Sequence, residues 1–315
     1  MNSRSWAVVL AGGDGMRLRP RTRQLFGDER PKQFCPILGG KTLIASTRER
    51  LAQVVPSDRT MFVVVKTHQR YYDSELSDVH ASRIVVQPVN IGTSAPIVYS
   101  LVRTRRLDKE AIVGFFPTDH YYADESAFTN AVQRAYGVAR RRPESLVLLA
   151  ADPHGPEVDY GWIEPYSRLR DDSNHWLYRV NRFCEKPSRS VAQRMLTRGC
   201  LWNTFVMVGR VGTFLEVLEQ TIPDTLRQFA PVAEICAPDR ERERADSIYG
   251  ALSLGDFSRQ VLSKCTDRLI ALRAPNVGWS DLGTPERVAS AMTPALTWGA
   301  LPGKKQITCE ELIYS

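Results

Sequence analysis

The chain has 315 residues, with 42 Lys and Arg against 35 Asp and Glu, and a net charge of +7. With 43% hydrophobic and 24% charged residues it has an ordinary soluble composition, and its length favours one α/β domain with a small appendage. The basic runs at 103–106 and 140–142 end helix-like segments without interleaved aromatic residues. This argues against nucleic acid as a partner and for small anionic substrates.

The cysteines and the apolar segments bear on the cellular compartment of the protein. Its six Cys residues show no C-x-x-C spacing, which argues against zinc and against a disulfide framework. No apolar stretch approaches the ~20 residues that span a bilayer, and the apolar run at 6–11 is too short for the core of a signal peptide. We therefore expect a cytoplasmic protein with reduced thiols and no membrane partner.

Strands and helices alternate through the first half. We expect strands at 6–11, 61–66, 84–86, 111–116 and 146–151, and helices at 42–55, 68–79, 95–106 and 125–142. Such alternation implies right-handed crossovers and a mostly parallel sheet with helices on both faces. Ligands bind these sheets at the carboxyl ends of the strands. The segment after 6–11 lies at such an end, and so does Asp119, which follows 111–116.

The second half is less regular. Strands are expected at 161–165, 176–183, 201–209 and 268–272, helices at 188–198 and 284–292, and a mainly helical stretch at 210–252. Asp281 follows the last of these strands, and we expect that strand to lie in the same sheet as 111–116. The sequence thus predicts one domain over 1–292 and a tail over 293–315.

The segment after the first strand is a glycine-rich loop with two cations. Gly12, Gly13 and Gly15 are followed by Arg17, and Lys32 comes soon after. The backbone N–H groups of such a loop bind a polyphosphate, and side-chain charges complete the site. A structural turn is the alternative for the glycines alone, but the preceding strand and the two cations favour phosphate binding.

Two better-known phosphate loops are excluded. The Rossmann fingerprint G-x-G-x-x-G requires a third glycine where Leu18 stands. The P-loop G-x-x-x-x-G-K-[ST] matches Gly40, Lys41 and Thr42 only in its second half, because Cys35 occupies the position of the first glycine. The loop at 12–17 therefore belongs to another class of phosphate-binding loop.

The residues around this loop resemble those of a known family. L-A-G-G-D-G-M-R-L at 10–18 with P-K-Q-F at 31–34 resembles the signature of the sugar nucleotidyltransferases, and most closely that of the mannose-1-phosphate guanylyltransferases. Further segments follow in the family's order at 87–88 with 92–96, 117–120, 160–164, 183–187, 202–203 and 278–283. Each segment alone is a weak signal, but seven in order are a strong one.

The resemblance implies a Rossmann-like, mostly parallel mixed sheet with helices on both faces. It also implies an enzyme that transfers a nucleotidyl group from a nucleoside triphosphate to a sugar 1-phosphate, with GTP and mannose 1-phosphate favoured and Mg²⁺ as the cofactor. A sugar-phosphate oxygen would attack the α-phosphate, and pyrophosphate would leave. Residues 1–150 would form the nucleotide-binding half and 151–292 the sugar-phosphate-binding half, and a homodimer is compatible with the resemblance.

The resemblance also assigns roles to residues of this chain. Arg17 would bind the β- and γ-phosphates and Lys32 the α-phosphate, as the catalytic cations. Asp119 and Asp281 would bind Mg²⁺, which takes few protein ligands and completes its shell with substrate oxygens. The nucleotide-binding residues would be Leu10, Ala11, Gly12, Gly13, Gly15, Gln87, Pro88, Gly92 and Thr93. The sugar-phosphate-binding residues would be Gly161, Glu185, Lys186 and Asn203.

Two departures from the family pattern leave alternatives open. Gln87 stands where the guanylyltransferases usually carry Glu, and glutamine there is usual in thymidylyl- and uridylyl-transferring relatives. Transfer of a pyrimidine nucleotide to a hexose 1-phosphate is therefore one alternative. Ser258 and Ser263 replace two acidic residues of the family's segment at 256–263. The loss of these two acidic residues motivates the other alternative, a non-catalytic relative that binds nucleotide-sugars.

Overall fold

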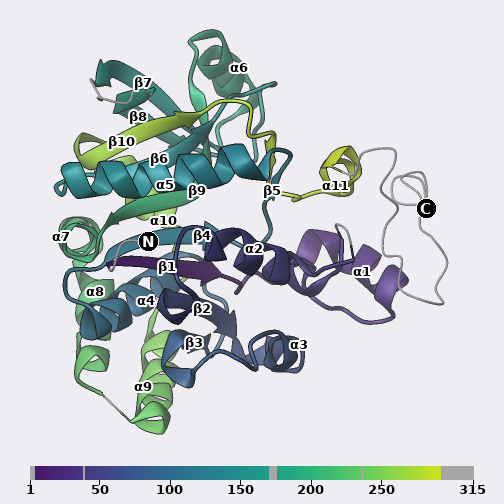
Figure 1. The fold of residues 1–315 in the computed structure, drawn as a ribbon, viewed down its shortest axis with the longest axis vertical. Coiled ribbons are helices and arrows are strands. Elements are labelled where there is room, and N and C mark those ends of the chain that lie inside the picture. Colours follow the sequence, from purple (N-terminus) through teal and green to yellow (C-terminus); the bar gives the residue numbers. More distant parts are fainter. Residues whose placement is uncertain (1–3, 38–39, 170–175, 236, 292–315) are drawn as a thin grey trace.

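The computed structural model describes residues 4–37, 40–169, 176–235 and 237–291, and its centre is a sheet of nine strands (Figure 1). Apolar runs such as T-M-F-V-V-V at 60–65 form these strands because β-branched side chains pack well on a sheet buried on both faces. In chain order the strands are β1 (Ser5–Leu10), β2 (Thr60–Val65), β3 (Ile84–Gln87), β4 (Ile112–Pro117), β6 (Leu146–Ala151), β7 (Gly161–Leu169), β8 (Leu177–Glu185), β9 (Leu201–Arg210) and β10 (Leu269–Ala274).

The sheet is mixed but mostly parallel. Its strands lie in the order β3-β2-β1-β4-β9-β6-β10-β8-β7, and the pairs β3/β2, β2/β1, β1/β4 and β6/β10 are parallel. Strand β9 is antiparallel to β4, β6 and β7, and β8 is antiparallel to β10 and β7. Within this sheet seven strands therefore run in one direction and two in the other, which confirms the predicted fold class.

Helices cover both faces of the sheet. In β1, Val8 lies in one core while Ala7 and Val9 lie in the other, because successive side chains of a strand point to opposite faces. The core around Val8 includes α4 (Ser94–Leu107), α7 (Val211–Thr221), α8 (Pro223–Phe229) and α9 (Pro238–Ala251). The opposite core includes α2 (Leu43–Ala52), α3 (Gln69–Glu75), α5 (Glu125–Arg141) and α6 (Arg189–Thr197).

The C-terminal part differs from the expectation in two respects. The stretch at 210–252 divides into α7, α8 and α9, because Pro223 and Pro238 fit the first turn of a helix but not its interior. We expected Asp281 to follow a strand of the main sheet, and this was wrong. It follows β11 (Trp279–Ser280), which pairs with β5 (Tyr121–Tyr122) in a separate two-stranded ribbon. The ribbon places Asp281 beside the segment that follows β4.

Three short α-helices remain, besides several single turns of 3-10 helix. The sequence did not predict α1 (Arg19–Phe26) or α10 (Phe257–Gln260), whereas α11 (Pro285–Ala291) matches the helix expected at 284–292. Helix α11 packs Val288 against Leu18 and Cys35 in a third, small core. This core fixes α11 to the segment around the glycine loop (Figure 1). The tail predicted at 293–315 lies outside the described residues.

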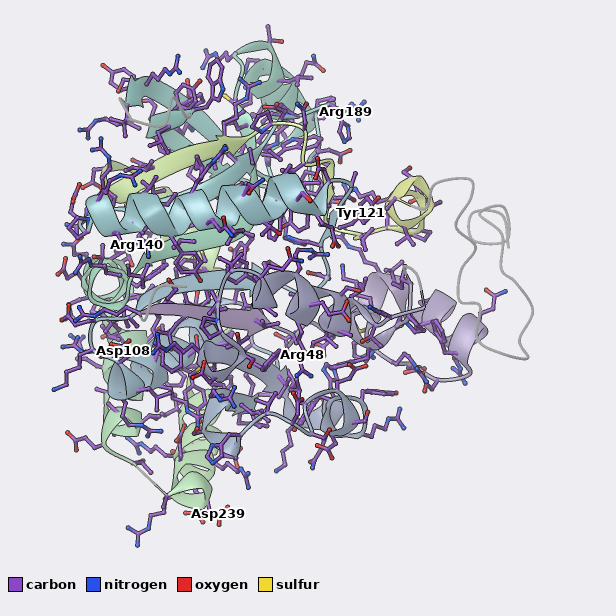
Figure 2. All side chains as sticks on the ribbon, viewed as in Figure 1. Arg48, Asp108, Tyr121, Arg140, Arg189 and Asp239 are labelled. Carbon is purple, nitrogen blue, oxygen red and sulfur yellow. The ribbon has the colours of Figure 1, made fainter. Side chains whose placement is uncertain are left out.

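The surface of the described part bears on two classes of partner, membranes and nucleic acids. None of its helices combines the length and the apolar character needed to cross a bilayer. Basic side chains are spread over separate elements: Arg48 lies on α2, Arg140 on α5 and Arg189 on α6 (Figure 2).

Candidate active site

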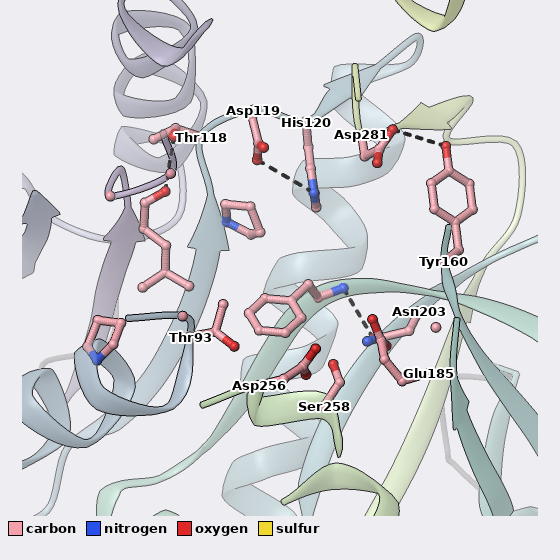
Figure 3. A pocket seen from close by; sticks show the side chains of 18 of the residues that line it. Thr93, Thr118, Asp119, His120, Tyr160, Glu185, Asn203, Asp256, Ser258 and Asp281 are labelled. Atoms are coloured by element: carbon pink, nitrogen blue, oxygen red, sulfur yellow. Dashed lines mark hydrogen bonds and ion pairs between the residues drawn. The ribbon is translucent and has the colours of Figure 1, made fainter. Parts of the chain in front are cut away.

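A cavity of about 410 Å³ lies where β1, β3 and β4 end. Its lining includes twelve of the seventeen site residues that the sequence suggested: Leu10, Gly12, Gly13, Gln87, Gly92, Thr93, Asp119, Gly161, Glu185, Lys186, Asn203 and Asp281. Ala11, Gly15, Arg17, Lys32 and Pro88 do not line it. In Figure 3 Asp119, His120 and Asp281 occupy one part of the wall, and Glu185, Asn203 and Ser258 another.

The glycine loop is held by a buried side chain that the sequence analysis did not single out. The Gln33 amide donates from Nε2 to the carbonyl oxygens of Ala11 (2.9 Å) and Gly13 (2.8 Å). In the part of the chain that the structure describes, the N–H groups of Gly12, Gly13 and Gly15 donate to no protein acceptor. The loop thus carries backbone donors beside the cavity, which is the arrangement that binds a phosphate chain.

Lys32 connects the glycine-loop side of the cavity to both aspartates. Its side chain is only 12% exposed, and Nζ lies 2.9 Å from Asp119 Oδ2. The same Nζ donates to the carbonyl oxygens of Asp281 (3.1 Å) and Leu282 (3.3 Å). Gly15 packs closely against the backbone of this residue: its φ is +61°, and a Cβ there would lie 3.1 Å from the main-chain nitrogen of Lys32. A largely buried ammonium group between these groups can act on a phosphate that enters the cavity.

Arg17 lies further out. Its side chain is 59% exposed and its Nη1 pairs with Asp159 Oδ2 at 3.1 Å. Asp159 lines the cavity, so Arg17 sits at its edge rather than in its wall. The sequence analysis missed Asp159, although it directly precedes the family-like segment at 160–164.

Asp119 and Asp281 flank the β5–β11 ribbon, since Asp119 lies two residues before β5 and Asp281 directly follows β11. Burial alone would raise the pKa of the Asp119 carboxyl, but its favourable interactions with Lys32, with His120 and with the backbone together outweigh this effect, and the pKa lies below its usual value. Asp281 Oδ1 accepts from the Tyr160 hydroxyl (3.2 Å) and from the Gly283 N–H (2.9 Å). Both aspartates are therefore held at the cavity by hydrogen-bond donors.

The two carboxylates fit Mg²⁺ better than a metal that needs a closed protein shell. In the described residues there is no group of three or more His, Cys, Asp and Glu arranged to hold a metal. A structural zinc site requires such a group, whereas Mg²⁺ is often held by one or two carboxylates, with waters and substrate phosphates completing its octahedron. Asp119 and Asp281 are the residues that could hold it.

His120 lies in a structural position beside Asp119. Its Nδ1 accepts from Trp279 Nε1 at 3.2 Å, and its Nε2 lies 3.8 Å from Asp119 Oδ1, too far for a hydrogen bond. Burial lowers the pKa of His120, so the ring is held neutral. It therefore links the β11 strand to the segment of Asp119 rather than adding a charge.

Arg287 on α11 is a cation that the sequence analysis missed. Its side chain is 16% exposed and donates to Asp281 (3.0 Å and 3.3 Å) and to Glu157 Oε2 (2.7 Å). It also lies 3.7 Å from Asp159 and stacks over the Tyr160 ring, 4.4 Å from its centroid. One guanidinium, on the last helix of the described chain, thus pairs with three carboxylates beside the cavity.

The segment predicted to bind the nucleobase is braced by residues distant in sequence. Gly92 has a φ of +90°, and a Cβ there would overlap the Gly255 carbonyl, so only glycine fits. Thr93 donates its N–H to the Gly255 carbonyl oxygen and accepts from the Phe257 N–H at its hydroxyl (2.9 Å). Gln87 at the end of β3 is buried and accepts from the Tyr249 hydroxyl (3.2 Å). This part of the cavity is consequently rigid.

Strand register brings the predicted sugar-phosphate residues together. Gly161 on β7 pairs with both Glu185 on β8 and Asn203 on β9, and Asn203 pairs with Ala150 near the carboxyl end of β6. A Cβ on Gly161 would lie 2.7 Å from Glu185 Oε2, so the glycine leaves room for that carboxylate. Lys186 follows with its Nζ 3.8 Å from Glu185 Oε1. A cation, a carboxyl and an amide therefore share one wall.

The two serines that replace family acids have different positions. Ser258 lines the cavity and hydrogen-bonds Glu185, whereas Ser263 is exposed and donates to the Arg259 carbonyl oxygen (2.6 Å). Burial, together with the nearby Asp256, raises the pKa of Glu185 to about 7. Of the two replacements, only the one at 258 changes the chemistry of the cavity.

Comparison with known proteins identifies the family. A family model described as "Nucleotidyl transferase" matches residues 6–297. The chain belongs to the nucleotidyl transferase family. Within it, the chain is similar to a protein named Mannose-1-phosphate guanylyltransferase 2 from Escherichia coli O157:H7, 26% identical over 298 residues that cover 88% of this chain. The chain spans 58% of the length of that relative.

Solved structures confirm the fold of this nucleotidyl transferase family member. One titled mannose-1-phosphate geranyltransferase, from Thermus thermophilus, is 27% identical, has a TM-score of 0.77, and covers 93% of this chain and 81% of its own. A UDP-glucose pyrophosphorylase complexed with UDP-glucose has a TM-score of 0.55 at 15% identity, covering 91% and 96% of the two chains, which is a likeness of fold alone.

Proposed function

We propose that this protein transfers a nucleotidyl group from a nucleoside triphosphate, GTP favoured, to a sugar 1-phosphate, mannose 1-phosphate favoured, with Mg²⁺ as cofactor. The observation that carries the proposal is one cavity lined by the glycine loop, by Asp119 and Asp281, and by Glu185 with its neighbours. A reaction between two anions requires cations and a metal site between two anion-binding walls. Relatives named as mannose-1-phosphate guanylyltransferases support this substrate pair.

The reaction is a displacement at the α-phosphate. An oxygen of the sugar phosphate forms the new bond to Pα, and the bond from Pα to the bridging oxygen of the β-phosphate breaks, so that pyrophosphate leaves with the electron pair. The N–H groups of Gly12 and Gly13 bind triphosphate oxygens, and Lys32 stabilises the charge that grows at Pα. Arg17 acts on the outer phosphates from the edge of the cavity. Mg²⁺ bound by the aspartates would neutralise charge on the triphosphate.

The second substrate occupies the opposite wall. Lys186 provides a point charge for the sugar phosphate, and Asn203 offers an amide for sugar hydroxyls. Glu185, which titrates near neutral pH, accepts from or donates to a hydroxyl according to its protonation. Gly161 keeps the backbone open to the sugar ring.

A uridylyl or thymidylyl transferase is the second candidate. Gln87 favours it because an amide pairs well with the edge of a pyrimidine, whereas a carboxylate suits the N1–H and N2–H₂ donors of guanine. Both candidates share the phosphate chemistry above and differ only in the base. A non-catalytic nucleotide-sugar-binding protein is the outcome if nucleotides bind without turnover.

The test is release of pyrophosphate in the presence of Mg²⁺. GTP, UTP and dTTP are each combined with mannose 1-phosphate and glucose 1-phosphate, and turnover with GTP and mannose 1-phosphate is expected to be fastest. Absence of pyrophosphate from every pair overturns the proposal. Thermal shifts with the same nucleotides then show whether the protein still binds them, since a ligand at 100 times its Kd stabilises by ~2.7 kcal/mol.

Asp119→Asn isolates the charge of one predicted metal ligand. It keeps the shape of the side chain, and we expect a loss of turnover of about 100-fold or more, equivalent to ~2.7 kcal/mol of transition-state stabilisation. Asp78→Asn is the matched control, because Asp78 is 68% exposed and pairs with Arg48 away from the cavity. Equal turnover in the two variants would remove Asp119 from the reaction.

A further inference from the structure

Gln87 presents one particular end of its amide to the cavity. The Tyr249 hydroxyl donates to Gln87 Oε1 at 3.2 Å in a buried contact. The other end of the amide, Nε2, lies beside Gly12, because a Cβ added to Gly12 would fall within contact distance of this nitrogen. Gln87 thus directs its NH₂ group toward the glycine loop and its oxygen toward α9.

Tyr249 is held firmly in this position. It is buried on α9, and its ring packs edge-on against Phe229 (centroids 5.9 Å apart), which in turn stacks on Tyr99 (5.4 Å). Earlier on α9, Glu241 accepts from the Tyr99 hydroxyl (2.9 Å) and pairs with Arg103 (3.1 Å). Helix α9 is therefore anchored at two points, and the Tyr249 hydroxyl cannot easily leave Gln87.

Only one orientation of the amide satisfies both side chains. Burial raises the pKa of Tyr249 well above its usual value, so the hydroxyl keeps its proton. In the described chain, Gln87 Oε1 is the protein acceptor for that proton. If the amide rotated by half a turn, Nε2 would face Tyr249 and the phenolic proton would be buried without an acceptor, which is unfavourable.

We propose that Tyr249 is a positioning residue that fixes the Gln87 amide with its NH₂ group toward the nucleotide, so that the site selects bases with a carbonyl oxygen at that point. Guanine O6 and uracil or thymine O4 are such acceptors. Adenine and cytosine carry an amino group on the corresponding edge, so this hydrogen-bond donor would face the NH₂ donor of Gln87 and the two could not pair. The inference rests on the proposed function, and it assigns the donor nucleotide to the keto bases.

The test compares nucleotides rather than total activity. Pyrophosphate release is measured with mannose 1-phosphate and GTP, UTP, dTTP, ATP or CTP, for the unchanged protein, Tyr249→Phe and Tyr99→Phe. We expect the unchanged protein to prefer the keto bases. In Tyr249→Phe the amide can rotate, and the ratio of kcat/KM for keto over amino bases should fall about tenfold, mainly through KM, as the loss of one buried hydrogen bond implies. Tyr99→Phe loses a buried hydroxyl from the same core but leaves Glu241 on α9 paired with Arg103 and Arg106, so it should keep the ratio.

Each other outcome decides against the inference. The inference is overturned if Tyr249→Phe keeps the keto-over-amino ratio of the unchanged protein, or if the ratio falls equally in Tyr99→Phe. It is also overturned if the unchanged protein shows no preference for keto bases. If Tyr249→Phe does not fold, Gln87→Met serves instead, and a ratio that survives removal of the amide refutes the role. If no pair of nucleotide and sugar phosphate releases pyrophosphate, the proposed function fails. The preference for keto over amino bases is then measured from the thermal shifts that the five nucleotides produce in the three proteins. Absence of binding to all five overturns both.

Discussion

Replacing Arg287 with Met removes the cation that α11 places among three carboxylates while keeping the aliphatic stem of the side chain. Arg287 is 16% exposed, and its partners Glu157, Asp159 and Asp281 are 33%, 32% and 24% exposed. Without the guanidinium these negative charges would repel one another. We expect the folded state to lose stability for that reason.

The magnitude lies between two limits. Breaking a fully buried ion pair costs about 3–5 kcal/mol, whereas an exposed pair contributes about 0–1 kcal/mol. Because water reaches a quarter to a third of each carboxylate, we expect about 2–3 kcal/mol. At about 2 °C per kcal/mol for a domain of this size, Tm should fall by about 4–6 °C.

The assay is thermal unfolding of the unchanged protein, Arg287→Met and Arg4→Met. The control residue Arg4 is 57% exposed and pairs with Glu110 at 3.4 Å, so its loss should lower Tm by no more than about 2 °C. Adding Mg²⁺ should raise Tm more in Arg287→Met than in the unchanged protein, since the metal no longer competes with Arg287 for Asp281. A Tm of Arg287→Met within about 1 °C of the unchanged protein would refute the reasoning.

Two further predictions concern the walls of the cavity. Gly12→Ala should lower the free energy of unfolding of the nucleotide-free protein by about 1–3 kcal/mol in urea titrations, because its Cβ meets the Gln87 amide. Gly13→Ala is the control and should leave that free energy unchanged, because nothing lies within 4 Å of its Cβ. Equal losses in the two variants would contradict this prediction. Glu185→Gln should match the unchanged protein at pH 5 and exceed its stability at pH 8. Burial and Asp256 raise the pKa of folded Glu185 from 4.5 to about 7, so the folded state favours the proton and loses stability as the pH rises across that range, by up to about 3 kcal/mol. A variant less stable than the unchanged protein at pH 8 would show that the carboxylate is stabilising instead.

Much of the cavity could be predicted because its residues follow recognisable strands. Leu10 ends β1, Gln87 ends β3 and Asp119 comes two residues after β4, so the rule that ligands bind at the carboxyl ends of parallel strands places them together. Apolar runs and helical spacing indicated the main strands and helices, with boundaries within a few residues. These are local signals, and local signals survive in a single sequence.

The residues that escaped prediction act through contacts between distant segments. Arg287 and Tyr249 lie on helices whose sequences read as ordinary amphipathic surface helices, and nothing local shows that one faces Asp281 and the other Gln87. The two-residue strands β5 and β11 are too short to carry a period, so the position of Asp281 outside the main sheet could not be read from the sequence. Gln33 was passed over because its role is to hold carbonyl oxygens of another loop.

The position of β10 in the sheet has a consequence for the synthesis of the protein. It is the last of the nine strands along the chain, yet it lies inside the sheet, where Leu269 pairs with Leu146 on β6 and Ile270 with Arg179 on β8. A nascent chain that has not reached Leu269 leaves β6 and β8 with unpaired edges, which recruit strands from other molecules. The growing chain is therefore prone to aggregation until β10 leaves the ribosome, and the pairing of such distant segments makes that closing step slow.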